Sequence, residues 1–317
     1  GGSGGDFGHS AVMIEELARA NATAVGFTTH SEIVAPYIVA YGSEEQKHKW
    51  LPRMVSGELI GVIAMSEPGI GSDLRSMRTL ARRDGDDYIV SGQKTFITNG
   101  SNAGLIVTAT KLDPAAKELT LICIEEEREG FSKGRRLEKI GLKGQDTAEL
   151  FFNDVKVPKA NLLGDGKAGF IYLMQMLAQE RLTNACGAVA GAEAAFRATL
   201  EYVHERKAFG KPIAEFQNTR FKLAELRTQI DVAQCFVDRC VMDHNEKKLT
   251  AEVAAEAKLF TTELLGKAVD EGVQLHGGAG YMWEYPICRM YANARIQRIF
   301  AGTSEIMKEI ISRGLKL

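Results

Sequence analysis

The sequence predicts an α+β protein with an N-terminal helical domain, a central β domain and a C-terminal helical bundle. Apolar residues recur at helical spacing toward both ends of the chain, and they follow a period of two in its middle. Clusters of turn-forming residues interrupt the middle segment at short intervals. These patterns place the domain boundaries at residues 1–58, 59–160 and 161–317.

The first segment is expected to be helical. Val12, Ile14 and Leu17 stand among polar residues with the spacing of an amphipathic helix. The run Ser43-Glu44-Glu45-Gln46 has the pattern of a capping box, which predicts that a helix begins there. Gly57 then marks the end of that helix, because glycine readily adopts the left-handed conformation that closes a helix.

The middle segment consists of short apolar runs separated by turn formers such as Asp84-Gly85-Asp86, Ser91-Gly92 and Asn99-Gly100. Regularly spaced strands of this kind favour a compact antiparallel sheet or barrel, and we expect a central antiparallel β-barrel-like domain. The expected strands include Tyr88–Val90, Leu105–Val107, Leu119–Ile124 and Leu150–Phe152.

The last segment contains long stretches with helical periodicity and short connections. Residues 251–273 are rich in Ala, Glu and Lys, which have high helix propensity. Long helices joined by short connections predict a four-helix bundle. One apolar stripe is formed by Phe170, Leu173, Leu177, Ala188, Ala195, Phe196 and Val203, and another by Phe221, Leu223, Leu226, Ile230 and Phe236.

The composition disfavours several classes of protein. With 317 residues and 45% hydrophobic content, the chain is long enough for two or three cores. A formal net charge of −2 gives no overall attraction to nucleic acid or to anionic lipid. No apolar run is long enough to cross a bilayer. The five cysteines form no Cys-x-x-Cys pair and no Cys/His cluster, so we expect buried thiols in a reducing compartment and no metal site.

Glu180 is the one ionisable residue that stands out on an apolar stripe. It follows Leu173 and Leu177 at helical spacing, so it should project from the face that carries core residues. Burial raises the pKa of a carboxyl group toward the range that suits a general base. A structural ion pair with Arg181 or with a neighbouring helix explains the same pattern, and periodicity alone leaves both explanations open.

Three glycine-containing clusters offer backbone N–H groups and hydroxyls for binding. In the first, Ser66–Asp73, glycines and serines suit a ligand-binding turn, although most such turns bind nothing. In the second, Gln274–Gly280, the glycines allow a helix end or a close approach to a ligand. In the third, Ala301–Glu305, Thr303 or Ser304 could cap the last helix, with Glu305 in its first turn.

Taken together, in order and at their separations, these segments resemble the acyl-CoA dehydrogenase family. The similarity runs along essentially the whole chain, and five ordered motifs carry it. They are Ala64–Asp73 (AMSEPGIGSD), Gly92–Gly100 (GQKTFITNG), Glu205–Gly210 (ERKAFG), Gln274–Gly280 (QLHGGAG) and Ala301–Glu305 (AGTSE).

The resemblance implies FAD as cofactor, a homotetramer built as a dimer of dimers, and electron-transferring flavoprotein as partner. It also implies roles for the residues that match the motifs. Met65, Ser66, Phe96, Ile97 and Thr98 would line the flavin, and Thr303 and Glu305 would contact its adenosine diphosphate part. Residues that would grip FAD across a subunit interface are Arg206, Phe209, Phe216, Gln217, Gln274, Leu275, Gly277 and Gly278. Residues that would contact acyl-CoA are Ser72, Gln179, Arg181, Ala301, Gly302 and Gly26.

The base is the point at which this chain departs from much of the family. Many members carry the catalytic Glu immediately before the Gly-Thr of the last motif, where this chain has Ala301. A smaller group, including long-chain and isovaleryl enzymes, carries it on the long helix before an arginine, which matches Glu180-Arg181. The resemblance therefore implies Glu180 as the base, with the backbone N–H of Ala301 donating to the thioester oxygen.

The resemblance also suggests a substrate. Residues 283–286 and 306–309 are more similar to long-chain than to isovaleryl members, which favours a medium-to-long straight acyl chain. Gly26 either deepens the acyl pocket or allows close helix packing. The alternatives are an isovaleryl or short branched-chain enzyme, a flavin oxidase or monooxygenase of the same fold, a nucleic-acid-binding relative, and a scaffold that has lost catalysis.

The beginning of the sequence allows two interpretations. Gly1-Gly2-Ser3-Gly4-Gly5 has the composition of a linker, but it also matches a glycine-rich stretch of the family. We interpret it as native sequence that follows missing N-terminal helices, so that the first domain is partial. With no targeting segment visible, we expect a cytoplasmic location in a bacterium or the mitochondrial matrix in a eukaryote.

Overall fold

The computed structural model describes residues 2–22 and 25–316, so Gly1 of the glycine-rich opening lies outside it. The chain forms two compact units, each built around its own core. Within the described residues, the β unit consists of residues 2–4, 25–139 and 143–177. The helical unit consists of residues 5–22, 140–142 and 178–316.

The first sheet of the β unit is buried on both faces. Its strand order is β1-β4-β5-β8, in which β1 runs parallel to β4 and the other neighbours are antiparallel. Every residue of β4 and β5 is buried, because helices cover one face of the sheet and the second sheet covers the other. The strands are β1 (Gly61–Ala64), β4 (Leu105–Thr110), β5 (Thr120–Glu125) and β8 (Leu162–Leu163).

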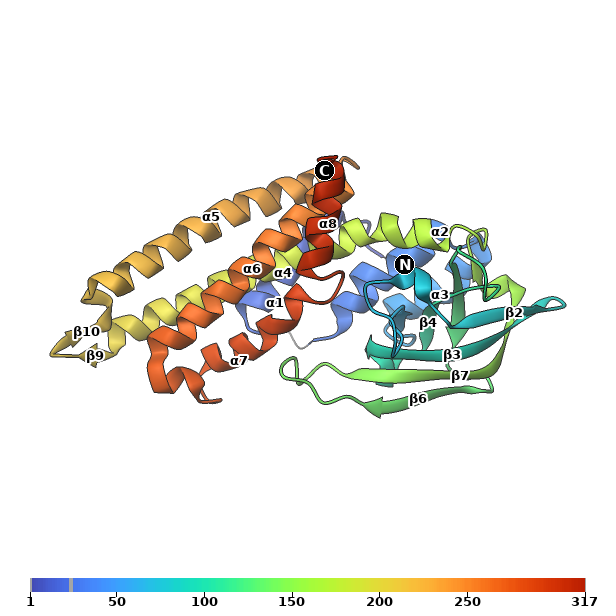
Figure 1. Ribbon diagram of the computed structural model, residues 1–317, viewed down its shortest axis with the longest axis horizontal. Helices are drawn as coiled ribbons and strands as arrows, with labels where there is room; N and C mark the ends of the chain where they lie inside the picture. The colour runs from blue at the N-terminus through green and yellow to red at the C-terminus, as the bar shows by residue number, and fades with distance from the viewer. Residues whose placement is uncertain (1, 23–24, 317) are drawn as a thin grey trace. The chain divides into compact units, whose positions relative to one another are not determined.

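The second sheet is entirely antiparallel, with strand order β2-β3-β7-β6 (Figure 1). Strands β2 and β3 form a hairpin whose turn contains Gly85 at φ 60°, which fits the turn expected at Asp84-Gly85-Asp86. Ile106 and Ile122 of the first sheet share a core with Leu150 and Phe152 of the second. The strands are β2 (Leu80–Asp84), β3 (Asp87–Thr98), β6 (Phe131–Arg136) and β7 (Thr147–Pro158).

Three details of the predicted β domain differ in the structure. The strands form two open four-stranded sheets packed face to face and do not close into a barrel, and the pairing of β1 with β4 is parallel. The expected turn at Ser91-Gly92 is absent, because β3 continues through it with a register shift. Glycine is needed at 92 for a different reason, since a Cβ atom there would lie 2.6 Å from the Thr79 hydroxyl oxygen.

Helices of the β unit pack against the first sheet and form a core around Tyr37 and Trp50. Helix α3 (Glu44–Val55) begins at Ser43 with the expected capping box, and Gly57 follows it at φ 78°. The shorter helices of this unit are η1 (Thr29–Val34), α2 (Ala35–Tyr41), η2 (Leu74–Ser76), η3 (Gly100–Asn102) and η4 (Lys159–Asn161).

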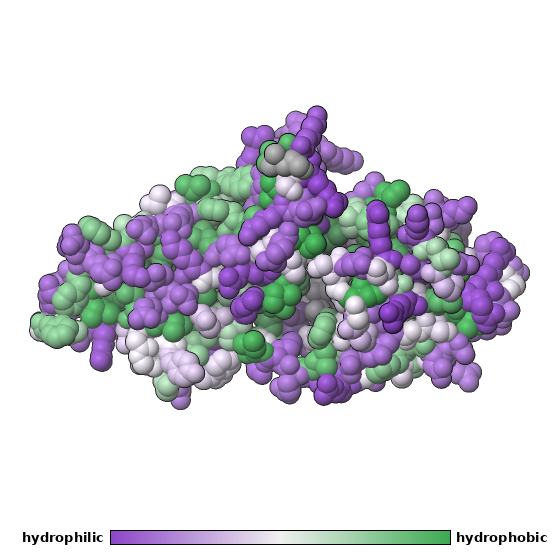
Figure 2. Space-filling view, viewed as in Figure 1, coloured by the Kyte–Doolittle hydropathy of each residue, from purple (hydrophilic) through white to green (hydrophobic). Residues whose placement is uncertain are grey.

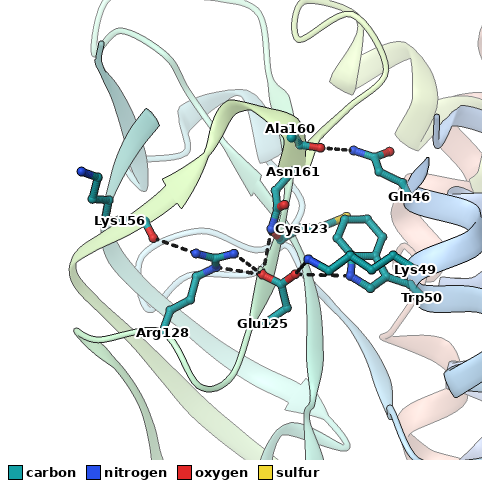
Figure 3. Close-up of polar contacts among 9 residues, drawn as sticks. All are labelled: Gln46, Lys49, Trp50, Cys123, Glu125, Arg128, Lys156, Ala160 and Asn161. Atoms are coloured by element: carbon teal, nitrogen blue, oxygen red, sulfur yellow. Dashed lines mark hydrogen bonds and ion pairs between the residues drawn. The ribbon is translucent and has the colours of Figure 1, made fainter. Parts of the chain in front are cut away.

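A buried carboxylate joins α3 to β5 and to the segment before β8 (Figure 3). Glu125, at the end of β5, accepts hydrogen bonds from Lys49, the Trp50 indole N–H, Arg128 and Asn161. Burial raises the pKa of Glu125, but these donors and cations outweigh it and lower the pKa to about 2. The carboxylate therefore stabilises the β unit in its ionised form.

In the helical unit, the long helices α4, α5 and α6 run beside one another (Figure 1), and shorter helices share their core. Its core includes residues of α1, so the first helix packs with the C-terminal helices. This arrangement agrees with a C-terminal helical bundle. The helices are α1 (Phe7–Arg19), α4 (Gly169–Glu205, of which residues from 178 onward belong here), α5 (Gln217–Asn245), η5 (Ile213–Glu215), α6 (Ala251–His276), η6 (Gly277–Tyr281), α7 (Pro286–Ala294), η7 (Arg295–Arg298) and α8 (Ser304–Gly314).

Among the helices of residues 2–22 and 25–316, none is both long and apolar enough to cross a membrane.

Candidate active site

The β unit brings two of the predicted flavin-lining segments together. Met65 and Ser66 follow β1, whereas Phe96, Ile97 and Thr98 form the end of β3. The backbone N–H of Thr95 donates to the carbonyl oxygen of Ser66 at 3.0 Å, which ties the two segments side by side. Residues 65–66 and 96–98, which are 31 positions apart in the sequence, thus lie next to each other, and we call this region the edge of the unit.

Phe96 has the properties of a binding residue. Its backbone lies in the left-handed region at φ 60°, in a strand that shifts register between Lys94 and Ile97. Its side chain is 69% exposed, whereas Thr95 and Ile97 beside it are buried. A bulky residue at positive φ is uncommon and costs free energy, so this outlier supports a functional role for the exposed ring.

A buried ion pair between Glu67 and Lys94 joins these two segments, and the sequence alone does not reveal it. The fully buried Lys94 Nζ donates to the Met65 carbonyl oxygen and to Glu67 Oε1, both at 3.0 Å. Burial lowers the pKa of Lys94 to about 8. Burial also acts to raise the pKa of Glu67, but Lys94 and the hydroxyl and backbone donors of Thr79 hold it below its usual value. Both residues stand in motifs quoted above, but no periodicity reveals that they are partners.

The remaining β-unit candidates occupy different environments. Ser72 is exposed in the turn after β1, as a ligand contact requires. Gly26 packs against the turn after β3, where the Asn99 side-chain amide donates to the Gly26 carbonyl oxygen at 2.7 Å. A Cβ atom at Gly26 would lie 2.1 Å from Asn99 Oδ1, so close packing is enough to explain this glycine.

In the helical unit, Glu180 is 3% exposed on α4, as its position on the apolar stripe predicts. The adjacent Arg181 is equally buried, and Gln179 is half-buried. A carboxylate and a guanidinium are rarely buried without partners, because removing either charge from water is costly. The position therefore has the burial that a general base needs.

The last motif forms a strained turn before α8. Ala301 and Gly302 lie at φ 51° and 96°, and Thr303 caps α8 by accepting a hydrogen bond from the Ile306 N–H at 3.3 Å. Glu305 lies in the first turn of α8, as predicted, and its own backbone N–H helps to lower its pKa. Alanine rarely adopts a positive φ, so contacts around the turn must hold it there.

Lys258 of α6 contacts this turn and lies near Arg181 of α4. Its fully buried Nζ donates to the Gly302 carbonyl oxygen at 2.8 Å and to the Gln297 carbonyl oxygen at 3.0 Å. Burial, with repulsion from the nearby charge of Arg181, lowers the pKa of Lys258 to about 8. The helical unit thereby brings Glu180-Arg181 into the neighbourhood of Ala301-Gly302.

A second group of candidates lies at the far end of the long helices. A short hairpin of β9 (Lys207–Ala208) and β10 (Lys211–Pro212) places Arg206, Phe209, Phe216 and Gln217 in one region, and the Phe209 and Phe216 rings meet edge to face at 6.2 Å. The Phe209 ring is 96% exposed.

The end of α6 packs against α4 shortly before this hairpin. The His276 ring stacks on Tyr202 at 4.0 Å, and the Tyr202 hydroxyl donates to the His276 carbonyl oxygen at 3.1 Å. Gly277 lies at φ 59°, and a Cβ atom at Gly277 or Gly278 would meet no atom within 4 Å. The glycines thus leave open space at the helix end, next to Gln274 and Leu275.

The two groups of the helical unit are far apart along one helix. Glu180 and Tyr202 both lie in the continuous helix α4. The 22 positions between them correspond to roughly 33 Å at 1.5 Å per residue. One chain therefore presents two separate sets of candidate binding residues.

Comparisons with known proteins match the whole chain to one family. Three family models match in order: the acyl-CoA dehydrogenase N-terminal domain at residues 1–58, the middle domain at 62–155 and the C-terminal domain at 167–316. The long-chain specific acyl-CoA dehydrogenase of Sus scrofa is 51% identical over 99% of this chain and 74% of its own length. The isovaleryl-CoA dehydrogenase of Pongo abelii is 37% identical over 99% of this chain and 75% of its own length.

Solved structures agree. An acyl-CoA dehydrogenase from Geobacillus kaustophilus has 51% identity and a TM-score of 0.98, covering 100% of this chain and 84% of its own. A Bacillus anthracis acyl-CoA dehydrogenase complexed with FAD has 34% identity and a TM-score of 0.95, covering 100% of this chain and 59% of its own. The chain therefore belongs to the acyl-CoA dehydrogenase family of FAD-dependent oxidoreductases that act on acyl-CoA thioesters.

Proposed function

We propose that this chain oxidises medium-to-long straight-chain acyl-CoA thioesters to trans-2-enoyl-CoA, with Glu180 as the base that removes the Cα proton. The observation that carries the assignment is the burial of Glu180 beside Arg181 in α4, combined with alanine at position 301. An alanine side chain cannot accept a proton. Other members of the family place the base directly before Gly-Thr, where this chain has Ala301. We therefore assign the role of base to the buried carboxylate of Glu180.

Each step of the proposed reaction is assigned to particular residues of the chain. Glu180 takes the Cα proton, and its buried surroundings keep water from competing for the proton. The backbone N–H of Ala301 donates to the thioester oxygen as negative charge develops there, which makes the Cα proton easier to remove. FAD, when bound, supplies the acceptor for the hydride that leaves Cβ. Ser72, Gln179, Arg181 and Gly302 would contact the acyl-CoA.

Several features of the described residues fit FAD. The exposed Phe96 ring, with Met65, Ser66, Ile97 and Thr98 on the same edge, suits the flat isoalloxazine. Thr303 and Glu305, at the N-terminus of α8, would contact the adenosine diphosphate part. The exposed Arg206 suits a pyrophosphate, because its guanidinium can donate two hydrogen bonds to the oxygens. Gly277 and Gly278 leave open space in which a ligand could approach the backbone closely.

We further propose that a second copy of the chain completes each FAD site. The set around Arg206 and Gly277 lies roughly 33 Å from Glu180 along α4, so both sets serve one cofactor more readily when they come from different chains. Hydrophobic atoms lie at the surface of the β9–β10 end of the helical unit, in agreement with the exposure of Phe209 (Figure 2). We expect light scattering of the purified holoenzyme to give the mass of a tetramer, and a monomer with full FAD content would contradict this.

The proposed substrate rests on the similarity to long-chain enzymes, which exceeds that to isovaleryl enzymes. We expect kcat/KM to be highest for a straight acyl chain of medium or greater length in a panel of acyl-CoA thioesters. A maximum with isovaleryl-CoA or butyryl-CoA would contradict this assignment. Electron-transferring flavoprotein is the proposed acceptor, and rapid reoxidation of the reduced enzyme by O₂ in stopped-flow measurements would instead indicate an oxidase.

The proposed compartment is the cytoplasm in a bacterium or the mitochondrial matrix in a eukaryote. Fractionation of the source cells tests it, and recovery of the protein outside both compartments would contradict it.

Glu180→Gln tests the base. The amide is nearly the same size as the carboxylate but cannot accept the Cα proton, so we expect normal FAD content and a kcat lower by several orders of magnitude. The measurement is dehydrogenation of a long-chain acyl-CoA with a dye as electron acceptor. Activity within about tenfold of the wild-type value would reject Glu180 as the base.

A further inference from the structure

The turn that presents the Ala301 N–H is strained. Ala301 and the following Gly302 both have positive φ, at 51° and 96°. For a residue with a side chain, this conformation is sterically unfavourable, because the Cβ atom crowds the backbone. The turn keeps this shape only if neighbouring groups hold it there.

Lys258 holds both ends of the turn. Its ammonium donates to the carbonyl oxygens of Gln297 and Gly302, at 3.0 and 2.8 Å. These carbonyls stand five positions apart, on either side of the tip Ile299-Phe300-Ala301. Charged donors form stronger hydrogen bonds than neutral ones, so a single buried group closes the base of the loop.

A second residue of α6, Glu263, contacts the chain on both sides of the turn. The Ser304 hydroxyl donates to Glu263 Oε1 at 2.6 Å, and Arg298 donates to the other oxygen of Glu263 at 3.2 Å. Glu263 lies five positions after Lys258 in α6. The loop is therefore braced from α6 on both sides of Gly302.

Burying Lys258 is costly if packing is its only task. Its side chain is fully buried, and removing an ammonium from water carries a penalty that an apolar residue of similar length avoids. The nearby Arg181 adds repulsion, while Glu263 is the facing group of opposite charge. The hydrogen bonds that Lys258 donates to the two carbonyl groups of the loop recover part of this penalty.

We propose that Lys258 is a positioning residue for the reaction, which orients the Phe300–Ala301 peptide so that its N–H points at the thioester oxygen. The inference rests on the proposed function. A donor to developing negative charge must lie about 2.7–3.1 Å from the oxygen. A displacement of about 1 Å costs on the order of 10²-fold in rate, so an unbraced loop would impair proton removal more than substrate binding.

The test is Lys258→Met in the FAD-loaded enzyme, compared with Lys267→Met, which removes an exposed lysine of the same helix. We expect Lys258→Met to lower kcat by about 10²-fold with KM changed less than about threefold, and Lys267→Met to match the wild type. A spectroscopic readout accompanies the kinetics. A 3-thiaacyl-CoA can lose its Cα proton but cannot donate a hydride, and its bound enolate gives a long-wavelength absorbance with oxidised flavin. We expect the pH midpoint of this band to rise in Lys258→Met.

A folded, FAD-loaded Lys258→Met with unchanged kcat and an unchanged pH midpoint would overturn the proposal, whatever its melting temperature. If Lys258→Met fails to fold, the same measurements are made on Lys258→Gln. The glutamine side chain is one atom shorter than lysine and can reach one of the two carbonyl groups at most. Unchanged values in folded Lys258→Gln would equally overturn the proposal, whereas a raised midpoint supports it. Failure of the proposed function is recognised separately, by a wild-type enzyme that oxidises no acyl-CoA or by a fully active Glu180→Gln.

Discussion

At the scale of single residues, Gly26 shows how a close contact can fix the identity of a residue. The Asn99 amide group lies so close to Gly26 that a Cβ atom would approach Asn99 Oδ1 to 2.1 Å. Asn99 itself lies at φ 60° and donates to the Gly26 carbonyl oxygen, so it cannot easily move away. The glycine allows the chain to pass directly over the turn that follows Thr98.

We therefore expect Gly26→Ala to destabilise the protein by about 1–3 kcal/mol through overpacking. The measurement is thermal unfolding, with Gly69→Ala as the matched control, because a Cβ atom at Gly69 would meet no atom within 4 Å. An unchanged melting temperature together with a shorter preferred acyl chain would favour the alternative, in which Gly26 shapes the acyl pocket.

At the scale of secondary-structure elements, the ends of β1 and β3 depend on one buried ion pair. Lys94 in β3 reaches back to the Met65 carbonyl oxygen and to Glu67, so the segment after β1 is fixed to the strand that carries Phe96. Glu67 has further donors in the Thr79 hydroxyl and in the backbone N–H groups of Arg78 and Thr79. Losing either member leaves the other charge buried without its counter-ion.

We expect Lys94→Met to destabilise the protein by roughly 3–5 kcal/mol and to lower FAD content, because an uncompensated carboxylate remains in the core. The measurement is the unfolding transition of the holoenzyme, together with its absorbance ratio for bound flavin. The double variant Glu67→Gln/Lys94→Met should recover part of the loss, since it removes both charges. Lys156→Met, which removes an exposed lysine from the neighbouring strand β7, is the control, and an equal effect there would contradict the explanation.

At the scale of the whole molecule, the cations and hydrogen-bond donors around the buried Glu125 carboxylate predict how stability depends on pH. The folded-state pKa of about 2 lies below the ordinary value of 4.5, so the folded protein binds the proton more weakly than the unfolded chain does. The stabilisation is therefore complete above about pH 4.5 and is lost as the pH falls toward 2. The difference in pKa corresponds to about 3 kcal/mol.

We expect Glu125→Gln to be less stable than the wild type at pH 7 and to show a weaker loss of stability between about pH 4.5 and 2. The measurement is the melting temperature across this pH range. Glu138→Gln provides the control, because the Glu138 side chain is 96% exposed. Parallel pH curves for Glu125→Gln and the wild type would show that Glu125 does not govern acid stability.

The order of the structural elements could be predicted from the sequence because it depends on local patterns. The capping box at Ser43–Gln46, the hairpin turn at Gly85 and the cap of α8 at Thr303 each use side chains and backbone groups within a few positions of one another. The burial of Glu180 followed in the same way from its helical spacing. The family resemblance supplied the expected roles of the site residues.

Contacts between distant parts of the sequence had to come from the tertiary structure. Whether the strands close into a barrel depends on how sheets pair at their edges, and the alternation of apolar residues is the same for open and closed sheets. The partnership of Glu67 with Lys94 spans 27 positions, and that of Lys258 with Gly302 spans 44. A lysine in a helix rich in Ala, Glu and Lys looks like a solvated residue, and only the packing of α6 against the turn before α8 shows that it is buried. The sequence by itself thus determined the elements and the family, because both are recorded in short motifs. The tertiary structure decided which charges are buried and which turns they hold, because those depend on distances between segments that are far apart in the chain.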